Sequence, residues 1–285
     1  MLSSVLLLQS VLSPLFAELA RTSGGHVGVF ATVLGSADRA ELNGSERFPM
    51  QSVYKLPIAM AVLDQVDRKT LTLTQKVTFR ARDMADVGFH SPLADCYPNG
   101  GIDVSVRDLI RAAIVDSDGV ASDALFALAG GGERITAYLR GLGIRDMDVV
   151  TTERAMFADR TRMTQYRNAA TPRAAVALLR ALYAGRGVTP AARELLLEDL
   201  TDSVPGARRI KGLLPAGTSV AHKTGTDGTH DGLTRATNDI GIVTLPDGRH
   251  LALAVFVKDS TADEAARERT IAAIARLAYD TWTAK

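Results

Sequence analysis

A serine and a lysine stand three positions apart in the stretch QSVYKLP (51–57), and this pair could form a nucleophile and its activating amine. A nucleophilic serine needs a base that accepts its proton and donors that stabilise the developing oxyanion. On the first turn of a helix, Ser52 and Lys55 would lie on one face, and a dry site favours the neutral amine that can act as a base. Taken alone, the pair is more simply explained as two solvated helix residues.

Two further motifs change this balance. SDG (117–119) follows a helical stretch, and the Ser117 hydroxyl could relay a proton to a leaving nitrogen. KTGT (223–226) ends a predicted strand. A cation and hydroxyls on an edge strand suit an anionic substrate, whose amide could also align with the strand backbone. Each motif is weak alone, but the three motifs in this order and on these elements are specific.

The first fifty residues predict a helix followed by two strands. Apolar residues recur at roughly helical spacing through the first 20 residues, and SGG (23–25) ends the helix. The stretch lacks the basic start of an export signal, so we expect an amphipathic first helix of the folded domain. HVGVFATVL (26–34) is typical of a buried strand, and a second strand follows. No other apolar run reaches the roughly 20 residues that a membrane span requires.

The middle of the chain, from about residue 52 to 200, predicts mostly helices. Ser105 with Asp108 three positions later indicates a capped helix start. Thr171 followed by Pro172 gives a good N-cap and first helical residue. Glycine stops after several apolar stretches agree with helices that end there.

The last part predicts strands again and then a closing amphipathic helix. The expected strands are 217–225, 238–246 and 250–258, with a hairpin signal at PDGR. Strands from both ends of the chain can form one five-stranded antiparallel sheet, flanked by the terminal helices. We therefore expect an α/β (α+β) fold in a single domain, residues 1–285. Its α/β lobe would span about 1–50 and 206–285, with an all-helical lobe inserted at about 51–205.

Composition narrows the function classes. The chain has 285 residues and a formal net charge of +1, so electrostatics gives no case for binding nucleic acid or an acidic membrane surface. A single cysteine cannot form an internal disulfide and gives no zinc-binding pair. The histidines show no ligand spacing, which disfavours a zinc hydrolase; they are His26, His90, His222, His230 and His250. We expect no metal and no cofactor, and we expect His222 to be a strand residue.

The pair of Ser52 and Lys55, SDG and KTGT together are the signature of class A β-lactamases and penicillin-binding proteins. Over nearly its whole length the chain resembles class A serine β-lactamases, and it is most similar to their extended-spectrum branch. The stretches that carry this likeness are HSPLADCYPNGG, RIKGLLPAGTSVAHKTGT and NDIGIV. The resemblance implies a serine β-lactamase/transpeptidase-like fold, hydrolysis of penicillins and cephalosporins, and antibiotic resistance. It also implies a monomeric protein of the periplasm or the exterior that needs no cofactor.

The resemblance implies a role for each motif residue. Ser52 would attack the β-lactam carbonyl, Lys55 would act as base or proton relay, and Ser117 would pass the proton to the lactam nitrogen. The backbone N–H groups of Ser52 and Thr226 would form the oxyanion hole. The residues implied in substrate binding are Lys223, Thr224, Gly225, Thr226 and Arg209. Arg209 could equally be an ordinary surface charge, like its neighbour Arg208.

A β-lactamase also needs a carboxylate that drives water onto the acyl-enzyme. The resemblance points to Glu153, in a long irregular segment from about 149 to 170 that is similar to the family's omega loop. A long loop in a compact domain is more often functional than filler. The alternative is a surface glutamate paired with an arginine such as Arg154 or Arg160.

Two positions depart from the family pattern. Gly119 stands where the family usually has an asparagine that contacts the substrate's acylamino group. Phe157 stands where an asparagine or histidine usually helps to position the hydrolytic water, and phenylalanine offers no hydrogen-bonding group. Slow deacylation would fit a second hypothesis, a penicillin-binding sensor or a D,D-peptidase-like acyl-transferase. A non-catalytic binding module is disfavoured because all the motif residues are present.

Overall fold

In the computed structural model, which describes residues 2–85 and 87–284, the chain divides into two units. The first consists of Met1–Val53, Ala169–Arg180 and Gly206–Lys285, and the second of Tyr54–Asn168 and Ala181–Pro205. The division differs from the expected lobes because Ala169–Arg180 falls in the first unit. There β7 (Ala169–Ala170) pairs with β3 (Phe48–Pro49), and Arg173 forms an ion pair with Glu41.

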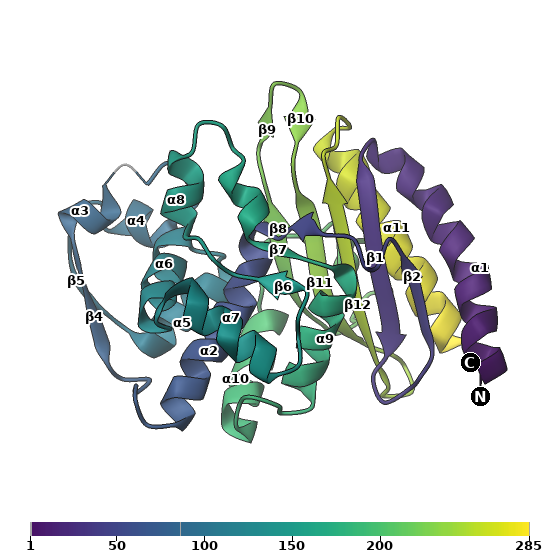
Figure 1. Cartoon of the computed structure of the whole chain (residues 1–285), viewed down its shortest axis with the longest axis horizontal. Helices are drawn as coiled ribbons and strands as arrows, with labels where there is room; N and C mark the ends of the chain where they lie inside the picture. Colours follow the sequence, from purple (N-terminus) through teal and green to yellow (C-terminus); the bar gives the residue numbers. More distant parts are fainter. Residues whose placement is uncertain (1, 86, 285) are drawn as a thin grey trace. The chain divides into compact units, whose positions relative to one another are not determined.

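The strands from both ends of the chain form one five-stranded sheet in the first unit, as predicted (Figure 1). Its order is β2-β1-β12-β11-β8, and every neighbouring pair is antiparallel. The strands are β1 (His26–Val33), β2 (Arg39–Leu42), β8 (Val220–Thr226), β11 (Thr237–Thr244) and β12 (His250–Lys258). The strand that carries KTGT, β8, therefore lies at an edge of this sheet.

Two terminal helices, α1 (Leu2–Ala20) and α11 (Glu264–Thr283), cover one face of the sheet. Alternate residues of β1, among them Val27 and Val29, join Leu12 and Phe16 of α1 in one apolar core. Trp282 of α11 is buried in the same core. Every second side chain of the strand points to this face of the sheet, and each helix presents one apolar face to it. The two ends of the chain therefore pack together although they are far apart in sequence.

The second unit is mainly helical, but it is not all-helical, because β4 (Lys76–Arg80) and β5 (Gly100–Ser105) form an antiparallel pair. Residues Lys55–Leu63 of α2 are buried, so this helix is the centre of the unit. The helices are α2 (Lys55–Asp67), α3 (Ala81–Met84), α4 (Pro92–Cys96), α5 (Val106–Val115), α6 (Gly119–Leu128), α7 (Gly131–Gly141), α8 (Glu153–Ala158) and α10 (Pro190–Thr201). Helix α9 (Pro172–Tyr183) runs from the first unit into the second.

The two helix starts predicted from their caps are confirmed. The Ser105 side chain accepts a hydrogen bond from the Asp108 N–H, and the Thr171 hydroxyl accepts one from Ala174. Short elements complete the chain: η1 (Arg21–Ser23), η2 (Gln51–Tyr54), η3 (Thr164–Arg167), η4 (Ile210–Leu213), β6 (Met147–Asp148), β9 (Thr229–His230) and β10 (Leu233–Thr234). Over the described residues, no helix combines the length and the apolar character that a bilayer crossing demands.

Candidate functional site

Ser52 lies in a 3₁₀ turn, η2, and the α-helix begins only at Lys55. This differs slightly from the expectation that Ser52 and Lys55 share the first turn of one helix. Gln51 adopts a left-handed backbone conformation (φ 46°) directly before the serine. Such a conformation is costly for a residue other than glycine, and it persists only where the surroundings enforce it.

The turn before Ser52 lies against the KTGT strand within the first unit. A Cβ atom on Gly225 would lie 2.2 Å from the Met50 carbonyl oxygen, so only glycine permits this approach. The Asn238 side chain of β11 donates hydrogen bonds to the carbonyl oxygens of Pro49 (2.8 Å) and Met50 (3.1 Å). The glycine of the motif therefore allows β8 to support the backbone that leads into Ser52.

The substrate-binding candidates occupy the end of β8. Lys223 and Thr224 are buried, and Thr226 is exposed at the last position of the strand. His222 is a buried strand residue, as expected, and its Nδ1 lies 3.0 Å from the Asp239 carboxylate. The accessible position of Thr226 agrees with a surface that a ligand could reach.

Arg209 is not an ordinary surface charge, because only 3% of it is exposed. Its guanidinium donates to Thr226 Oγ1 (2.8 Å), to the Asn238 carbonyl (3.0 Å) and to Glu268 (3.2 Å). The neighbouring Arg208 is the exposed one, and it also pairs with Glu268. Arg209 therefore orders the end of β8 and holds the Thr226 hydroxyl.

Three of the predicted catalytic residues come together in the second unit. The Lys55 amino group donates a hydrogen bond to the Ser117 carbonyl at 2.5 Å and lies 3.5 Å from the Glu153 carboxylate. The lysine side chain is only 1% exposed. A buried amine between the serine of SDG and a carboxylate is a suitable arrangement for moving protons.

Ser117 lies between α5 and α6 in a left-handed conformation, with φ of 60°. The neighbouring Asp118 holds this turn in place. Its buried carboxylate accepts hydrogen bonds from the N–H groups of Ala121 (2.8 Å) and Leu93 (2.7 Å) and from the Ser91 hydroxyl. The aspartate of the motif is thus the structural support of the serine.

The prediction that 149–170 is irregular is wrong in part, because this segment contains α8 and η3. Glu153 is the first residue of α8. Two caps explain the short helix. Thr152 accepts a hydrogen bond from the Ala155 N–H, and the Asp123 carboxylate accepts from the N–H groups of Glu153 (2.7 Å) and Arg154 (3.0 Å). A negative charge at a helix start is favourable.

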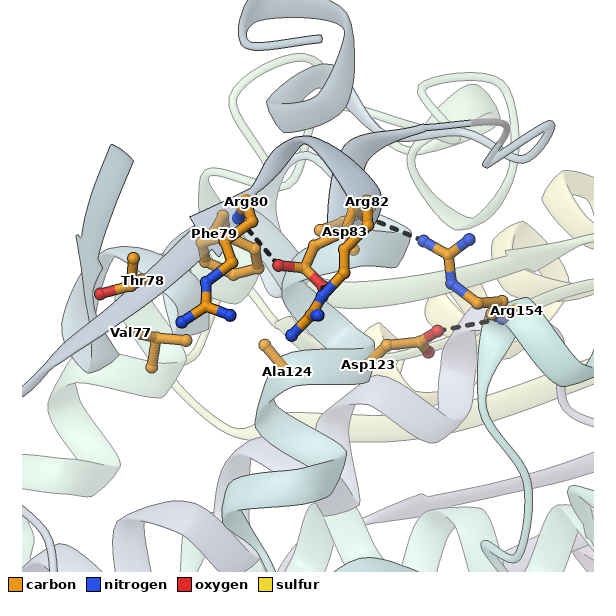
Figure 2. A pocket seen from close by; sticks show the side chains of 10 residues that line it. Val77, Thr78, Phe79, Arg80, Arg82, Asp83, Asp123, Ala124 and Arg154 are labelled. Atoms are coloured by element: carbon orange, nitrogen blue, oxygen red, sulfur yellow. Dashed lines mark hydrogen bonds and ion pairs between the residues drawn. The ribbon is translucent and has the colours of Figure 1, made fainter. Parts of the chain in front are cut away.

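Asp123 was not identified from the sequence, and it is the anchor of Glu153. Burial raises the pKa of Asp123 to about 6, and the two backbone hydrogen bonds oppose this rise. Figure 2 shows its carboxylate beside Arg154, whose side chain extends toward the backbone of Asp83 (2.9 Å). The arginine that was an alternative partner for Glu153 is therefore directed elsewhere.

Tyr54, between Ser52 and Lys55 in the sequence, was also not identified. Its hydroxyl donates a hydrogen bond to the Glu153 carboxylate at 2.6 Å. Burial and the nearby Glu153 charge raise the pKa of Tyr54 well above its ordinary range, so the hydroxyl stays a donor. The only feature of the sequence that could have indicated this role is a tyrosine, which has both an aromatic ring and a hydroxyl, between Ser52 and Lys55.

A pocket of about 450 Å³ lies beside these supports (Figure 2). It is lined by Val77, Thr78, Phe79, Arg80, Arg82, Asp83, Val120, Asp123, Ala124 and Arg154. None of the four catalytic candidates lines it. The pocket borders the residues that hold the start of α8, and it does not contain the glutamate itself.

Comparisons with known proteins agree on one family. A family model described as "Beta-lactamase enzyme family" matches residues 11–282. The extended-spectrum β-lactamase PER-1 of Pseudomonas aeruginosa is 40% identical over 275 residues, which cover 95% of this chain and 88% of that protein. A crystal structure of a β-lactamase from Chitinophaga pinensis DSM 2588 has a TM-score of 0.91 at 41% identity and covers 95% of this chain and 99% of that one. The extended-spectrum β-lactamase TLA-1 has a TM-score of 0.93 at 34% identity, with 97% and 99% covered.

Proposed function

Since the chain belongs to the β-lactamase enzyme family, as a class A β-lactam hydrolase, we propose that it opens penicillins and cephalosporins through an acyl-enzyme on Ser52. The observation that carries this proposal is the position of Lys55, hydrogen-bonded to Ser117 and 3.5 Å from Glu153. Ser52 precedes this lysine by three residues on one continuous helical stretch.

In the first half-reaction, Ser52 Oγ attacks the carbonyl carbon of the lactam, and the bond from that carbon to the lactam nitrogen breaks. Lys55 accepts the serine proton directly or as a relay. Ser117 passes its hydroxyl proton to the departing nitrogen and takes up the proton that Lys55 accepted from Ser52, so charge does not accumulate on the nitrogen. Because the Lys55 side chain is buried and hydrogen-bonded to the Ser117 carbonyl, little reorganisation of this amine is needed when the proton moves.

In the second half-reaction, Glu153 takes a proton from water, and the water oxygen attacks the ester carbonyl. The bond from that carbon to Ser52 Oγ breaks, and Ser52 Oγ receives the proton that Glu153 took from water, so both groups return to their starting states. Tyr54 and Asp123 support this step, because one holds the carboxylate of Glu153 and the other holds its backbone N–H. A general base whose carboxylate and backbone are both fixed by hydrogen bonds is well suited to repeated deacylation.

The substrate carboxylate is bound at the end of β8 by Lys223, Thr224 and Thr226. Arg209 contributes through its hydrogen bond to the Thr226 hydroxyl, which keeps that group oriented. The N–H groups of Ser52 and Thr226 stabilise the oxyanion. The contact of Gly225 with the Met50 backbone supports this assignment, because it ties the two segments that carry these N–H groups.

The competing function is a penicillin-binding sensor or acyl-transferase with slow deacylation. Turnover of nitrocefin, followed together with intact mass, separates the two. Many turnovers with little covalent adduct support the hydrolase, and a single stoichiometric burst with a lasting adduct supports the sensor. Ser52→Ala should lose both turnover and adduct, whereas the exposed control Ser45→Ala should keep both. An adduct of penicillin mass on Ser52→Ala would overturn the nucleophile assignment.

Location and oligomeric state stay predictions. A periplasmic or secreted enzyme should appear in the periplasmic or extracellular fraction of its host, and light scattering should give the mass of one chain, 30.4 kDa. Co-purification with the cytoplasmic fraction, or a dimer mass, would contradict the respective prediction.

A further inference from the structure

The pocket of about 450 Å³ beside the start of α8 (Figure 2) is a cavity that the proposed chemistry does not use. All the residues that line it belong to the second unit, and neither Glu153 nor Lys55 is among them. Its volume lies in the range of cavities that hold small molecules. The chemistry of its walls therefore indicates what a second ligand would be.

The floor of the pocket is apolar. Phe79 and Val120 are buried, and Val77 and Ala124 complete this surface. Because the side chain of Ala124 ends at Cβ, α6 leaves room above it. A hydrocarbon group that rests on this floor would gain free energy by leaving water.

Three arginines surround this floor. Figure 2 shows the guanidinium groups of Arg80 and Arg82 extending toward Ala124, while Arg154 reaches the pocket from α8. Arg154 donates a hydrogen bond to the backbone carbonyl of Asp83 at 2.9 Å, which leaves its positive charge without a carboxylate at that contact. A guanidinium has five N–H donors, so Arg154 can keep this bond and still bind an anion.

The acidic residues of the pocket do not neutralise these arginines. Three arginines and two aspartates give the lining a formal charge of +1. The Asp123 carboxylate already accepts two backbone N–H groups, and the Asp83 carboxylate accepts the Arg80 N–H at 2.8 Å. Arg82 Nε is 3.8 Å from the Asp83 carboxylate, which is too far for a hydrogen bond. Within the described part of the chain, the Arg80 guanidinium forms no ion pair.

We propose that this pocket is a second ligand site for a small organic dianion, with two carboxylate or phosphate groups on a compact apolar body. One anionic group binds Arg80 and Arg82, the other binds Arg154, and the apolar body rests on the floor between them. Guanidinium groups bind the paired oxygens of such groups in a bidentate manner. A monoanion lacks one of these two attachments and therefore binds less tightly.

The test measures binding of isophthalate, an aromatic dicarboxylate, to the full chain by isothermal titration calorimetry at constant ionic strength. Benzoate, with one carboxylate, should bind roughly tenfold more weakly, because it loses a charge-assisted partner. The double variant Arg80→Gln/Arg82→Gln should weaken isophthalate binding by roughly tenfold or more. The control Arg145→Gln removes an exposed arginine of the same unit and should leave binding unchanged. Absence of binding to the parent, or equal weakening by the double variant and the control, overturns the proposal.

Ala124→Leu separates the cavity from general surface charge. The change keeps every charge and a good helix former, but the longer side chain extends from α6 over the floor. It should weaken isophthalate binding by roughly tenfold or more, and Tm without ligand should stay close to that of the parent. Parent-like binding in this variant overturns the proposal.

Hydrogen exchange then locates the bound ligand. Isophthalate should slow amide exchange in α3, α6 and α8 of the parent, because a ligand that binds the folded state suppresses local opening around its site. Protection confined to β8 would place the ligand elsewhere and overturn the proposal. Neither measurement depends on turnover, so a failure here leaves the acyl-enzyme on Ser52 unaffected.

Discussion

Replacing Asp123 with asparagine should change how the stability of the protein depends on pH. The ordinary pKa of an aspartate is 3.8, and burial raises that of Asp123 to about 6. The folded protein therefore binds a proton more readily than the unfolded chain between these values. The stability from this group is present below about pH 4 and is lost as pH rises through about 6.

The size of the effect follows from the same pKa. A change from 3.8 to about 6 corresponds to about 3 kcal/mol, at 1.36 kcal/mol for each pH unit. Asparagine has the shape of aspartate but does not titrate, so Asp123→Asn should remove this slope. Asparagine has one acceptor oxygen, and one of the two N–H groups of Glu153 and Arg154 then loses its partner, which costs about 1–3 kcal/mol.

Asp123→Asn should therefore be clearly less stable than the parent near pH 4.5 and close to it near pH 8. Urea unfolding of both proteins across this range measures the difference in free energy of unfolding. The exposed Asp95→Asn serves as the matched control and should follow the parent at every pH. A parent–variant difference that stays constant with pH would show that Asp123 does not titrate in this range, and the burial argument would be wrong.

Three further changes test the supports of the site. Glu153→Gln should acylate and then stall, with deacylation slower by roughly 10² to 10⁴; intact-mass spectra that show no accumulated acyl-enzyme would contradict this. Tyr54→Phe should slow deacylation by roughly tenfold, as expected for loss of one hydrogen bond to a carboxylate, while burst kinetics show unchanged acylation; an equal loss in both steps would indicate a general packing defect. Gly225→Ala should lower Tm by several degrees and remove most turnover, because its Cβ would lie 2.2 Å from the Met50 carbonyl oxygen; a parent-like Tm would mean that the turn before Ser52 can move aside.

The sheet and the helix starts were predictable because their signals are local. The continuous apolar run within 250–258 gave β12 with the observed bounds, and the caps Ser105 and Thr171 lie within three residues of the groups that they bind. The KTGT strand was also placed correctly, at an edge of the sheet. Such patterns depend on neighbours along the chain, which a single sequence contains.

The supports of Glu153 could not be predicted in this way, because their partners are distant in sequence. Tyr54 is 99 residues from Glu153, and Asp123 is 30 residues from it. Their residue types fit ordinary roles equally well, a core aromatic and a helix aspartate. The expected irregular loop was wrong in part, because α8 begins at Glu153 with a local cap from Thr152 and a distant one from Asp123 of α6.

Gly119 and Phe157 show how contacts between residues distant in sequence change the functional interpretation of single positions. Each position, taken alone, reads as the loss of a polar group from the site. In the structure both belong to one cluster, because the missing side chain at 119 gives space to Phe89, and Phe157 packs against that ring over Gly88. Residues that share a contact have non-additive effects. The effect of restoring a polar side chain at either position therefore depends on Phe89, and Phe157→Asn with Phe89 present removes the edge-on contact that holds the ring beside Glu153.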